Sequence, residues 1–279
     1  MNIYERVAVS SVTFRDLPLE EALRRLRGAG FTRLDLTAIR HYCDHFDPLL
    51  VDVGEDECVR VRDLIARYDM RAISLTTFPA NPLSHTLNGD DWTEGVDAYV
   101  RLGLHLGATW YLLPPGSPAP QPEHWRATAE HAKPWLRDAA MRILNAGMQP
   151  VIALQSGSLA RTSADGLHLR TLLGLPSIGL ATDPAHAFAM GEDPVAALRQ
   201  LGDALAFVVL RDTNGVSFNL PPGLGRLDYP AILAMLDDID YLGPLVLAID
   251  DITLPVDTRA TLLKKAWEYL DGLSQQQAA

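Results

Sequence analysis

An aspartate and a histidine lie three residues apart in the segment 182–186, which reads TDPAH. This segment directly follows the apolar run 177–181. A carboxylate and an imidazole at the carboxyl end of a buried strand are suited to metal ligation or to proton transfer. Asp183 and His186 are therefore our first candidates for a functional site.

Short β-prone runs alternate with amphipathic stretches along the whole chain, a pattern typical of βα units and a parallel sheet. The expected strands are 7–14, 33–37, 72–77, 109–113, 150–155, 178–183, 206–211 and 245–250. Eight such units in 279 residues match the size of a (β/α)8 barrel. We predict a single α/β domain of this type over residues 1–273, followed by a disordered tail over 274–279.

An open, doubly wound sheet is the alternative fold. It is disfavoured because no Gly-x-Gly-x-x-Gly turn follows the first expected strand. In a (β/α)8 barrel the active site lies at the carboxyl ends of the strands. The further polar candidates at those ends, or in the loops that follow them, are Asp35, His41, Gln155, Arg211, Asp212 and Asp250.

Composition and charge argue against several classes of protein. The chain has 24 basic and 35 acidic residues, and a net charge of −11 disfavours binding to nucleic acid or to anionic membranes. The sequence contains no uninterrupted run of about 18 apolar residues, so we expect neither a membrane span nor a signal peptide. Cys43 and Cys58 are the two cysteines of the chain, and they do not form a C-x-x-C motif. We therefore expect both to be reduced thiols. We expect a cytoplasmic protein with a small-molecule partner, and a homodimer is possible.

Four segments carry a resemblance to a known family. They are 28–36 (GAGFTRLDL), 183–193 (DPAHAFAMGED), 209–212 (VLRD) and 222–229 (PGLGRLDY). In this order they resemble motifs of the xylose isomerase-like barrels, which include sugar and sugar-phosphate isomerases and epimerases, inosose dehydratases and apurinic endonucleases. The resemblance runs over nearly the whole chain and implies a barrel that acts on a sugar-like substrate.

The resemblance also implies a metal position. The family typically holds a divalent ion with glutamate on strand five, aspartate on strand six, histidine on strand seven and glutamate on strand eight. The matching positions here are Gln155, Asp183, Val209 and Ala248. Valine and alanine supply no donor, and an amide is a poor substitute for a carboxylate. We therefore expect a degenerate metal site and no cofactor.

A displaced ion is the alternative that this comparison leaves open. Asp212 directly follows the seventh expected strand and Asp250 ends the eighth, and with Asp183 and His186 they would supply oxygen and nitrogen donors. For each of these carboxylates, a role in capping a strand-end turn is the competing interpretation.

Chemistry without a metal is the interpretation that we prefer. His186 would act as general acid or base, Asp183 would orient it or abstract a proton, and Arg211 would supply a fixed positive charge. The other candidates, Gln155, Asp35, His41, Asp212 and Asp250, would bind substrate.

The predicted function is that of a sugar isomerase or epimerase acting on a polyhydroxylated or carbonyl substrate by proton transfer. Two other functions stay open. One is a barrel that binds a sugar-like ligand or a partner without catalysis, and the other is a metal-independent lyase or cyclase. A fold by itself does not separate these functions.

Overall fold

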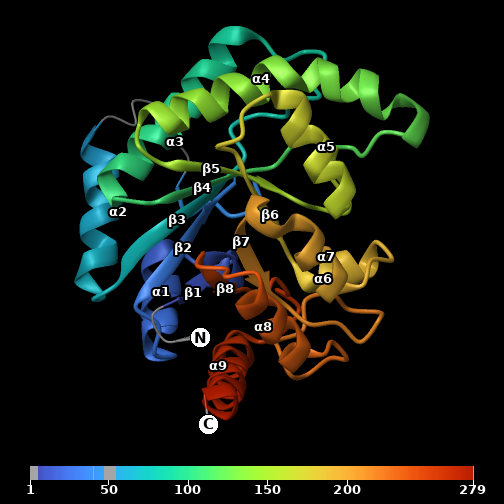
Figure 1. The fold of residues 1–279 in the computed structure, drawn as a ribbon. Coiled ribbons are helices and arrows are strands. Elements are labelled where there is room, and N and C mark those ends of the chain that lie inside the picture. The colour runs from blue at the N-terminus through green and yellow to red at the C-terminus, as the bar shows by residue number, and fades with distance from the viewer. Residues whose placement is uncertain (1–5, 40, 47–54, 279) are drawn as a thin grey trace.

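A computed structural model describes residues 6–39, 41–46 and 55–278. Eight parallel strands close into a barrel in the order in which they occur in the sequence. Helices surround the barrel (Figure 1). The prediction of a single (β/α)8 barrel is confirmed.

The strands are short and lie close to their expected positions. They are β1 (Val7–Ser10), β2 (Arg33–Ala38), β3 (Arg71–Thr77), β4 (Trp110–Leu113), β5 (Gln149–Ala153), β6 (Gly179–Thr182), β7 (Leu205–Leu210) and β8 (Leu245–Leu247). Strand β1 pairs with β8 as well as with β2, and this pairing closes the barrel.

The helices that follow the strands complete the repeats. They are α1 (Leu19–Gly28), α2 (Glu55–Arg67), α3 (Gly89–Leu106), α4 (Trp125–Asn145), α5 (Ser163–Leu173), α6 (Pro184–Ala189), α7 (Pro194–Leu201), α8 (Tyr229–Asp238) and α9 (Val256–Ala278). Short 3₁₀ helices are η1 (Ser11–Phe14), η2 (Pro122–His124) and η3 (Gly202–Ala204). Helix α9 continues to Ala278, past the expected domain end at residue 273.

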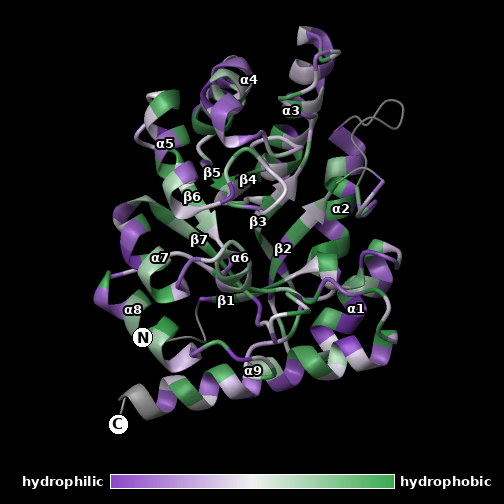
Figure 2. Ribbon diagram, turned by 90° about the vertical axis from the view of Figure 1, so that its right-hand side faces the viewer, coloured by the Kyte–Doolittle hydropathy of each residue, from purple (hydrophilic) through white to green (hydrophobic). Residues whose placement is uncertain are grey.

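Two apolar layers hold the barrel. Inside it, side chains from seven of the strands form a compact cluster: Ala8, Ile73, Leu112, Val151, Ala181, Phe207 and Val246. A larger layer fills the space between the strands and the helices. Hydrophobic and hydrophilic residues alternate along α9 in Figure 2, as expected of a helix that buries one face. The strands are therefore fixed on both sides, and their carboxyl ends have defined positions.

The first strand is shorter than the sequence predicts. It ends at Ser10, and the chain then turns into η1, with the Ser10 hydroxyl accepting a hydrogen bond from the amide of Val12 at 3.3 Å. The Thr13 hydroxyl in this turn accepts from the amide of Ile249, which follows β8. The turn thus ties the ends of β1 and β8 together. Among the described residues, no helix is long and apolar enough to cross a membrane.

Candidate active site

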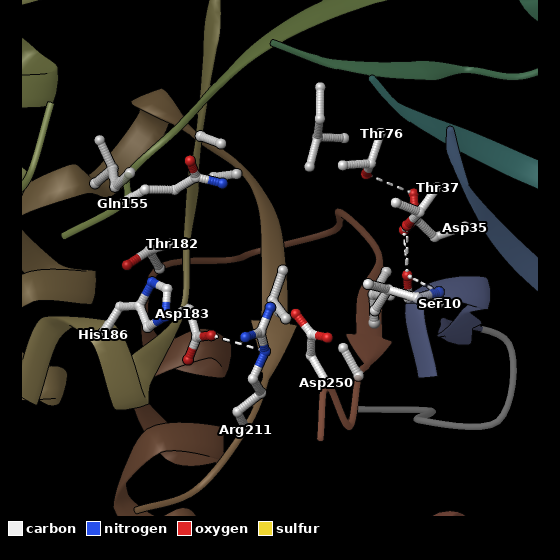
Figure 3. A pocket seen from close by; sticks show the side chains of 18 of the residues that line it. Ser10, Asp35, Thr37, Thr76, Gln155, Thr182, Asp183, His186, Arg211 and Asp250 are labelled. Carbon is white, nitrogen blue, oxygen red and sulfur yellow. Dashed lines mark hydrogen bonds and ion pairs between the residues drawn. The ribbon is translucent and has the colours of Figure 1, made fainter. Parts of the chain in front are cut away.

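A cavity of 310 Å³ opens where the carboxyl ends of the strands meet. Six residues expected from the sequence line it: Asp35, Gln155, Asp183, His186, Arg211 and Asp250. Figure 3 shows their side chains around the cavity. The barrel thus brings together residues that are far apart in the sequence.

Asp183 and Arg211 form an ion pair in this cavity. The carboxylate lies directly after β6, and the guanidinium lies directly after β7. Oδ2 of Asp183 lies 3.2 Å from Nε of Arg211, and the two side chains are 5% and 17% exposed. Oδ1 of Asp183 accepts a hydrogen bond from the amide of Ala185 at 2.9 Å and so caps α6. Asp183 therefore fixes both Arg211 and the first turn of α6.

Arg211 makes a second side-chain contact and also lines the cavity. Its Nη1 donates to Oδ1 of Asn219 at 2.9 Å, in the loop after β7. Because Arg211 also lines the cavity, the fixed guanidinium presents positive charge to any ligand there.

His186 lies in the short helix α6, on the same side of the cavity as Asp183 (Figure 3). Its Nδ1 atom is buried and has no hydrogen-bond partner in the part of the chain that the structure describes. The expectation that Asp183 orients His186 is not met in the structure, because the Asp183 oxygens face Ala185 and Arg211 instead. His186 therefore lines the cavity with one ring nitrogen that is not engaged by another described residue.

Asp250 lies after β8 and is held by two residues from other loops. Nε of Arg15 donates to Oδ1 of Asp250 at 2.7 Å, and the hydroxyl of Tyr42 donates to Oδ2. The guanidinium of Arg15 lies 4.3 Å from the centre of the Tyr42 ring. Partial burial and the bond to Asp250 raise the pKa of Tyr42 to about 12, so it stays a hydrogen-bond donor at neutral pH. Asp250 therefore lines the cavity with both of its carboxylate oxygens held by hydrogen bonds.

Asp35, on β2, is the most enclosed carboxylate of the cavity. It is 3% exposed, and the donors of its hydrogen bonds among the described residues are all hydroxyl groups. The donors are Ser10 at 2.8 Å, Ser74 at 2.8 Å, Thr76 at 2.9 Å and Thr37 at 3.4 Å. Burial raises the pKa of Asp35 above its usual value, and these hydroxyl groups oppose the shift.

The four positions that the resemblance assigns to metal ligands do converge. Gln155, Asp183, Val209 and Ala248 all line the cavity. Two of these side chains have no donor atom, and the one carboxylate is already paired with a guanidinium. A divalent ion there would meet one carboxylate and one amide beside a fixed positive charge, so the residues present do not fit it. Within the described ranges, no group of three or more His, Cys, Asp and Glu side chains could hold a metal.

The displaced metal site does not assemble either, because Asp212 points away from the cavity. It is fully buried, and its oxygens accept hydrogen bonds from four backbone amides: Thr213 at 2.7 Å, Gly223 at 3.1 Å, Gly225 at 3.0 Å and Leu227 at 3.1 Å. This carboxylate organises the glycine-rich loop that resembles the family motif. It has no free oxygen for a substrate or a metal.

The loop after β2 holds one predicted residue and one unexpected one. His41 is exposed and does not line the cavity; its amide donates to Asp44. His45 is 5% exposed, with Nε2 facing the carbonyl oxygens of Phe14 and Leu17 and Nδ1 near the Ser11 hydroxyl. Burial lowers the pKa of His45, so it is a neutral residue that fixes the loop.

Several cavity residues were not predicted from the sequence. Tyr42, Thr37, Thr76 and Asn219 line the cavity. Thr37 and Thr76 lie on expected strands with the parity that faces the barrel interior, so the alternation of strand residues could have found them. Tyr42 and Asn219 lie in loops, where no periodic signal exists.

The sequence matches a known family of barrels over most of its length. The model of the xylose isomerase-like TIM barrel family matches residues 23–272. The chain belongs to this family. Among curated relatives, the rhizopine catabolism protein MocC of Rhizobium meliloti is 25% identical over 259 residues, covering 83% of this chain and 74% of the relative. The L-ribulose 3-epimerase of Methylomonas sp. (strain DH-1) is 25% identical over 226 residues, covering 78% and 77%.

Solved structures of xylose isomerase-like barrels share the fold. A D-psicose 3-epimerase determined in the presence of D-fructose superposes with a TM-score of 0.75 at 14% identity, covering 95% of this chain and 97% of that one. A structure of L-ribulose 3-epimerase gives a TM-score of 0.76 at 18% identity, covering 98% and 97%. At these identities the likeness establishes the barrel, and the activity has to be argued from the cavity.

Proposed function

We propose that this protein is a sugar isomerase or epimerase that moves a proton next to a carbonyl group without a divalent metal. Two kinds of observation support this. The family and its named relatives include sugar 3-epimerases. An imidazole with an unpartnered ring nitrogen and a guanidinium held by Asp183 both line the cavity.

The observation that carries the proposal is the Asp183–Arg211 ion pair. Removing a proton from the carbon next to a carbonyl leaves an electron pair that forms a carbon–carbon double bond, and negative charge develops on the carbonyl oxygen. A preorganised cation next to that oxygen stabilises the charge. Arg211 is such a cation, and its contacts with Asp183 and Asn219 hold it before substrate arrives.

His186 is the residue that we assign to proton transfer. Its imidazole lines the cavity, and the buried Nδ1 atom makes no hydrogen bond. It would remove the proton as a base and return one as an acid, and return to the opposite face of the carbon gives an epimer. Asp183 is a positioning residue in this scheme, and Gln155 would bind a substrate hydroxyl group.

A non-catalytic sugar-binding barrel is the second candidate, and one observation favours it. Two of the positions that the resemblance assigns to metal ligands carry Gln155 and Ala248, which supply no carboxylate. A cavity of this kind could bind a sugar and leave it unchanged. The two functions differ in whether a carbon-bound proton of the sugar exchanges with solvent.

The experiment follows that proton. Purified protein is incubated in D₂O with D-fructose, D-psicose and L-ribulose in separate tubes, and deuterium incorporation next to the carbonyl is followed by ¹H NMR. We expect exchange with at least one ketose and loss of exchange in His186→Asn, with Thr182→Val as a control on the same cavity wall. Binding of these ketoses without exchange would support the sugar-binding barrel.

A further inference from the structure

A second polar wall lies in the same cavity, built by β1, β2 and β3. Asp35 and the hydroxyl groups of Ser10, Thr37 and Thr76 line the cavity on these strands. The barrel order places β2 and β3 across from β6 and β7. Figure 3 shows this group on one side of the cavity and His186 and Asp183 on the other. We call the group of Ser10, Asp35, Thr37 and Thr76 the hydroxyl wall.

The Asp35 carboxylate sets the direction of the hydrogen bonds in the hydroxyl wall. In its ionised form this carboxylate only accepts, so Thr76 points its hydrogen at Oδ1 over 2.9 Å. Ser10 likewise donates to Oδ2 at 2.8 Å. The hydroxyl oxygen of Thr37 lies 2.9 Å from the Ser10 oxygen and 3.4 Å from Oδ2 of Asp35. Because Ser10 donates its hydrogen to Asp35, the Thr37 hydroxyl donates either to the Ser10 oxygen or to Oδ2. The hydrogens of the wall thus point away from the cavity.

Two of these hydroxyl oxygens keep open lone pairs. The Ser10 oxygen already accepts from the amide of Val12. Among the described residues, no group donates to the hydroxyl oxygen of Thr76, and the one hydroxyl within hydrogen-bond distance of the Thr37 hydroxyl oxygen is that of Ser10. A buried negative charge behind a hydroxyl group makes its oxygen a better acceptor. Thr37 and Thr76 therefore offer the cavity polarised acceptors.

The two sides of the cavity are chemically opposite. Arg211 can only donate hydrogen bonds, whereas the hydroxyl wall mainly accepts them. A carbonyl or enediolate oxygen fits the Arg211 side, and a hydroxyl group, which can donate, fits the other. Asp35 also has no basic partner in its recorded contacts, so the wall would repel an anionic group such as a phosphate or a carboxylate.

We propose that Thr37 and Thr76 form a subsite that accepts hydrogen bonds from the hydroxyl groups of an uncharged polyhydroxylated substrate and so orients its carbonyl end toward Arg211. This inference rests on the proposed function in that it takes the substrate to be a sugar. It adds that the substrate carries no phosphate on the end that faces Asp35. Asp35 acts as a positioning residue behind the two hydroxyl groups.

The chain supplies a matched pair of variants to test this subsite. Thr76 and Ser74 both donate to Oδ1 of Asp35, at 2.9 and 2.8 Å. Thr76 lines the cavity, whereas Ser74 is fully buried and does not. Thr76→Val removes an oxygen that faces the ligand, and Ser74→Ala removes an equivalent bond to Asp35 without touching the cavity. A purely structural role would make the two variants behave alike.

The probes are D-sorbitol and ribitol, which keep the hydroxyl groups of a sugar and lack the carbonyl. Their binding is measured by NMR titration, and urea unfolding confirms that each variant is folded. We expect binding to the wild-type protein, a loss of about tenfold in affinity in Thr76→Val, and a change of less than about twofold in Ser74→Ala. Thr37→Val should weaken binding in the same way as Thr76→Val. D-Sorbitol 6-phosphate should bind more weakly than D-sorbitol.

Two outcomes would overturn the subsite: no binding of either polyol to the wild-type protein, or equal affinities in Thr76→Val and Ser74→Ala. Failure of the proposed function would look different. A protein that binds polyols through Thr76 but exchanges no ketose proton would retain the subsite and lose the enzymatic assignment. A protein that exchanges ketose protons equally well with and without the Thr76 hydroxyl would retain the activity and lose the subsite.

Discussion

Nε of Arg211 lies 3.2 Å from Oδ2 of Asp183 inside the cavity of the barrel. Asp183 is the one residue that matches a metal ligand by its position in the family motif, and here its partner is a guanidinium. Arginine stays protonated at any working pH, so the positive charge next to Asp183 is permanent. The pair explains how a xylose isomerase-like barrel can present positive charge to a substrate when valine and alanine occupy two metal positions.

Replacing Arg211 with an uncharged residue should lower both the stability of the fold and the rate of proton exchange. Arg211→Met leaves the buried Asp183 carboxylate without its cation, so we expect the free energy of unfolding to fall by about 3 kcal/mol. Proton exchange with a reactive ketose should fall by about 10²-fold or more, because the cation at the developing oxyanion is gone. Urea unfolding and NMR exchange measure the two effects.

The control variant is Arg211→Lys. Lysine keeps the charge but has no fork that reaches both Asp183 and Asn219, so stability should recover more fully than exchange. Equal exchange rates in the wild-type protein and in Arg211→Met would show that the guanidinium takes no part in the chemistry.

Asp212 should matter for stability and little for ligand contacts. Asp212→Asn replaces one carboxylate oxygen with an NH₂ group facing backbone amides that need an acceptor, so we expect a loss of about 3 kcal/mol in the free energy of unfolding. Asp228→Asn is the matched control, because Asp228 is an N-cap that accepts from one amide, that of Ala231. It should cost about 1 kcal/mol or less. An equal effect of the two substitutions would contradict the role given to Asp212.

The contrast between Arg211 and Asp212 shows what the sequence could and could not predict. The barrel, its eight strands and the strand-end positions follow from periodicity. Arg211 and Asp212 are the two residues that follow β7, and the alternation of that strand puts Arg211 on the same side as Val209, which lines the cavity, and Asp212 on the other side. Both were candidates because both lie at the end of the seventh expected strand. The same alternation should have excluded Asp212.

Other features of the cavity depend on contacts that no local pattern encodes. Tyr42 and Arg15 reach Asp250 from loops that precede it by 208 and 235 residues. The expectation that Asp183 orients His186 came from their spacing alone, but a carboxylate that caps a helix points its oxygens at the first amides of that helix. The ion pair with Arg211 needed the closed barrel to become visible.

His45 should make stability depend on pH. Its folded pKa is lowered by burial from 6.5, so the neutral ring stabilises the fold above pH 6.5. As the pH falls below that value, the unfolded chain binds a proton that the folded chain does not, and this contribution is lost. In His45→Gln, urea unfolding should show a smaller decrease of stability over the same pH range. His41→Gln, which removes an exposed imidazole from the same loop, should behave like the wild-type protein.

Metal removal should leave the activity in place. The residues that line the cavity do not fit a divalent ion, so dialysis against a chelator is expected to leave the rate of ketose proton exchange within about twofold. Addition of Mn²⁺, Mg²⁺ or Co²⁺ should not raise the rate above that of the untreated protein. Elemental analysis of each sample gives the metal content against which the rates are compared. A rate that follows metal content would instead indicate a site that the described residues do not reveal.

The central claim is that His186 moves the proton of a ketose, with Arg211 stabilising the developing negative charge, and that no metal takes part. The most direct measurement is ¹H NMR of deuterium incorporation next to the carbonyl of D-fructose, D-psicose or L-ribulose, with chelator-treated protein in D₂O. The claim predicts incorporation by the metal-free wild-type protein and none above background by His186→Asn. Incorporation that appears only when a divalent metal is restored, or that persists unchanged in His186→Asn, would contradict it.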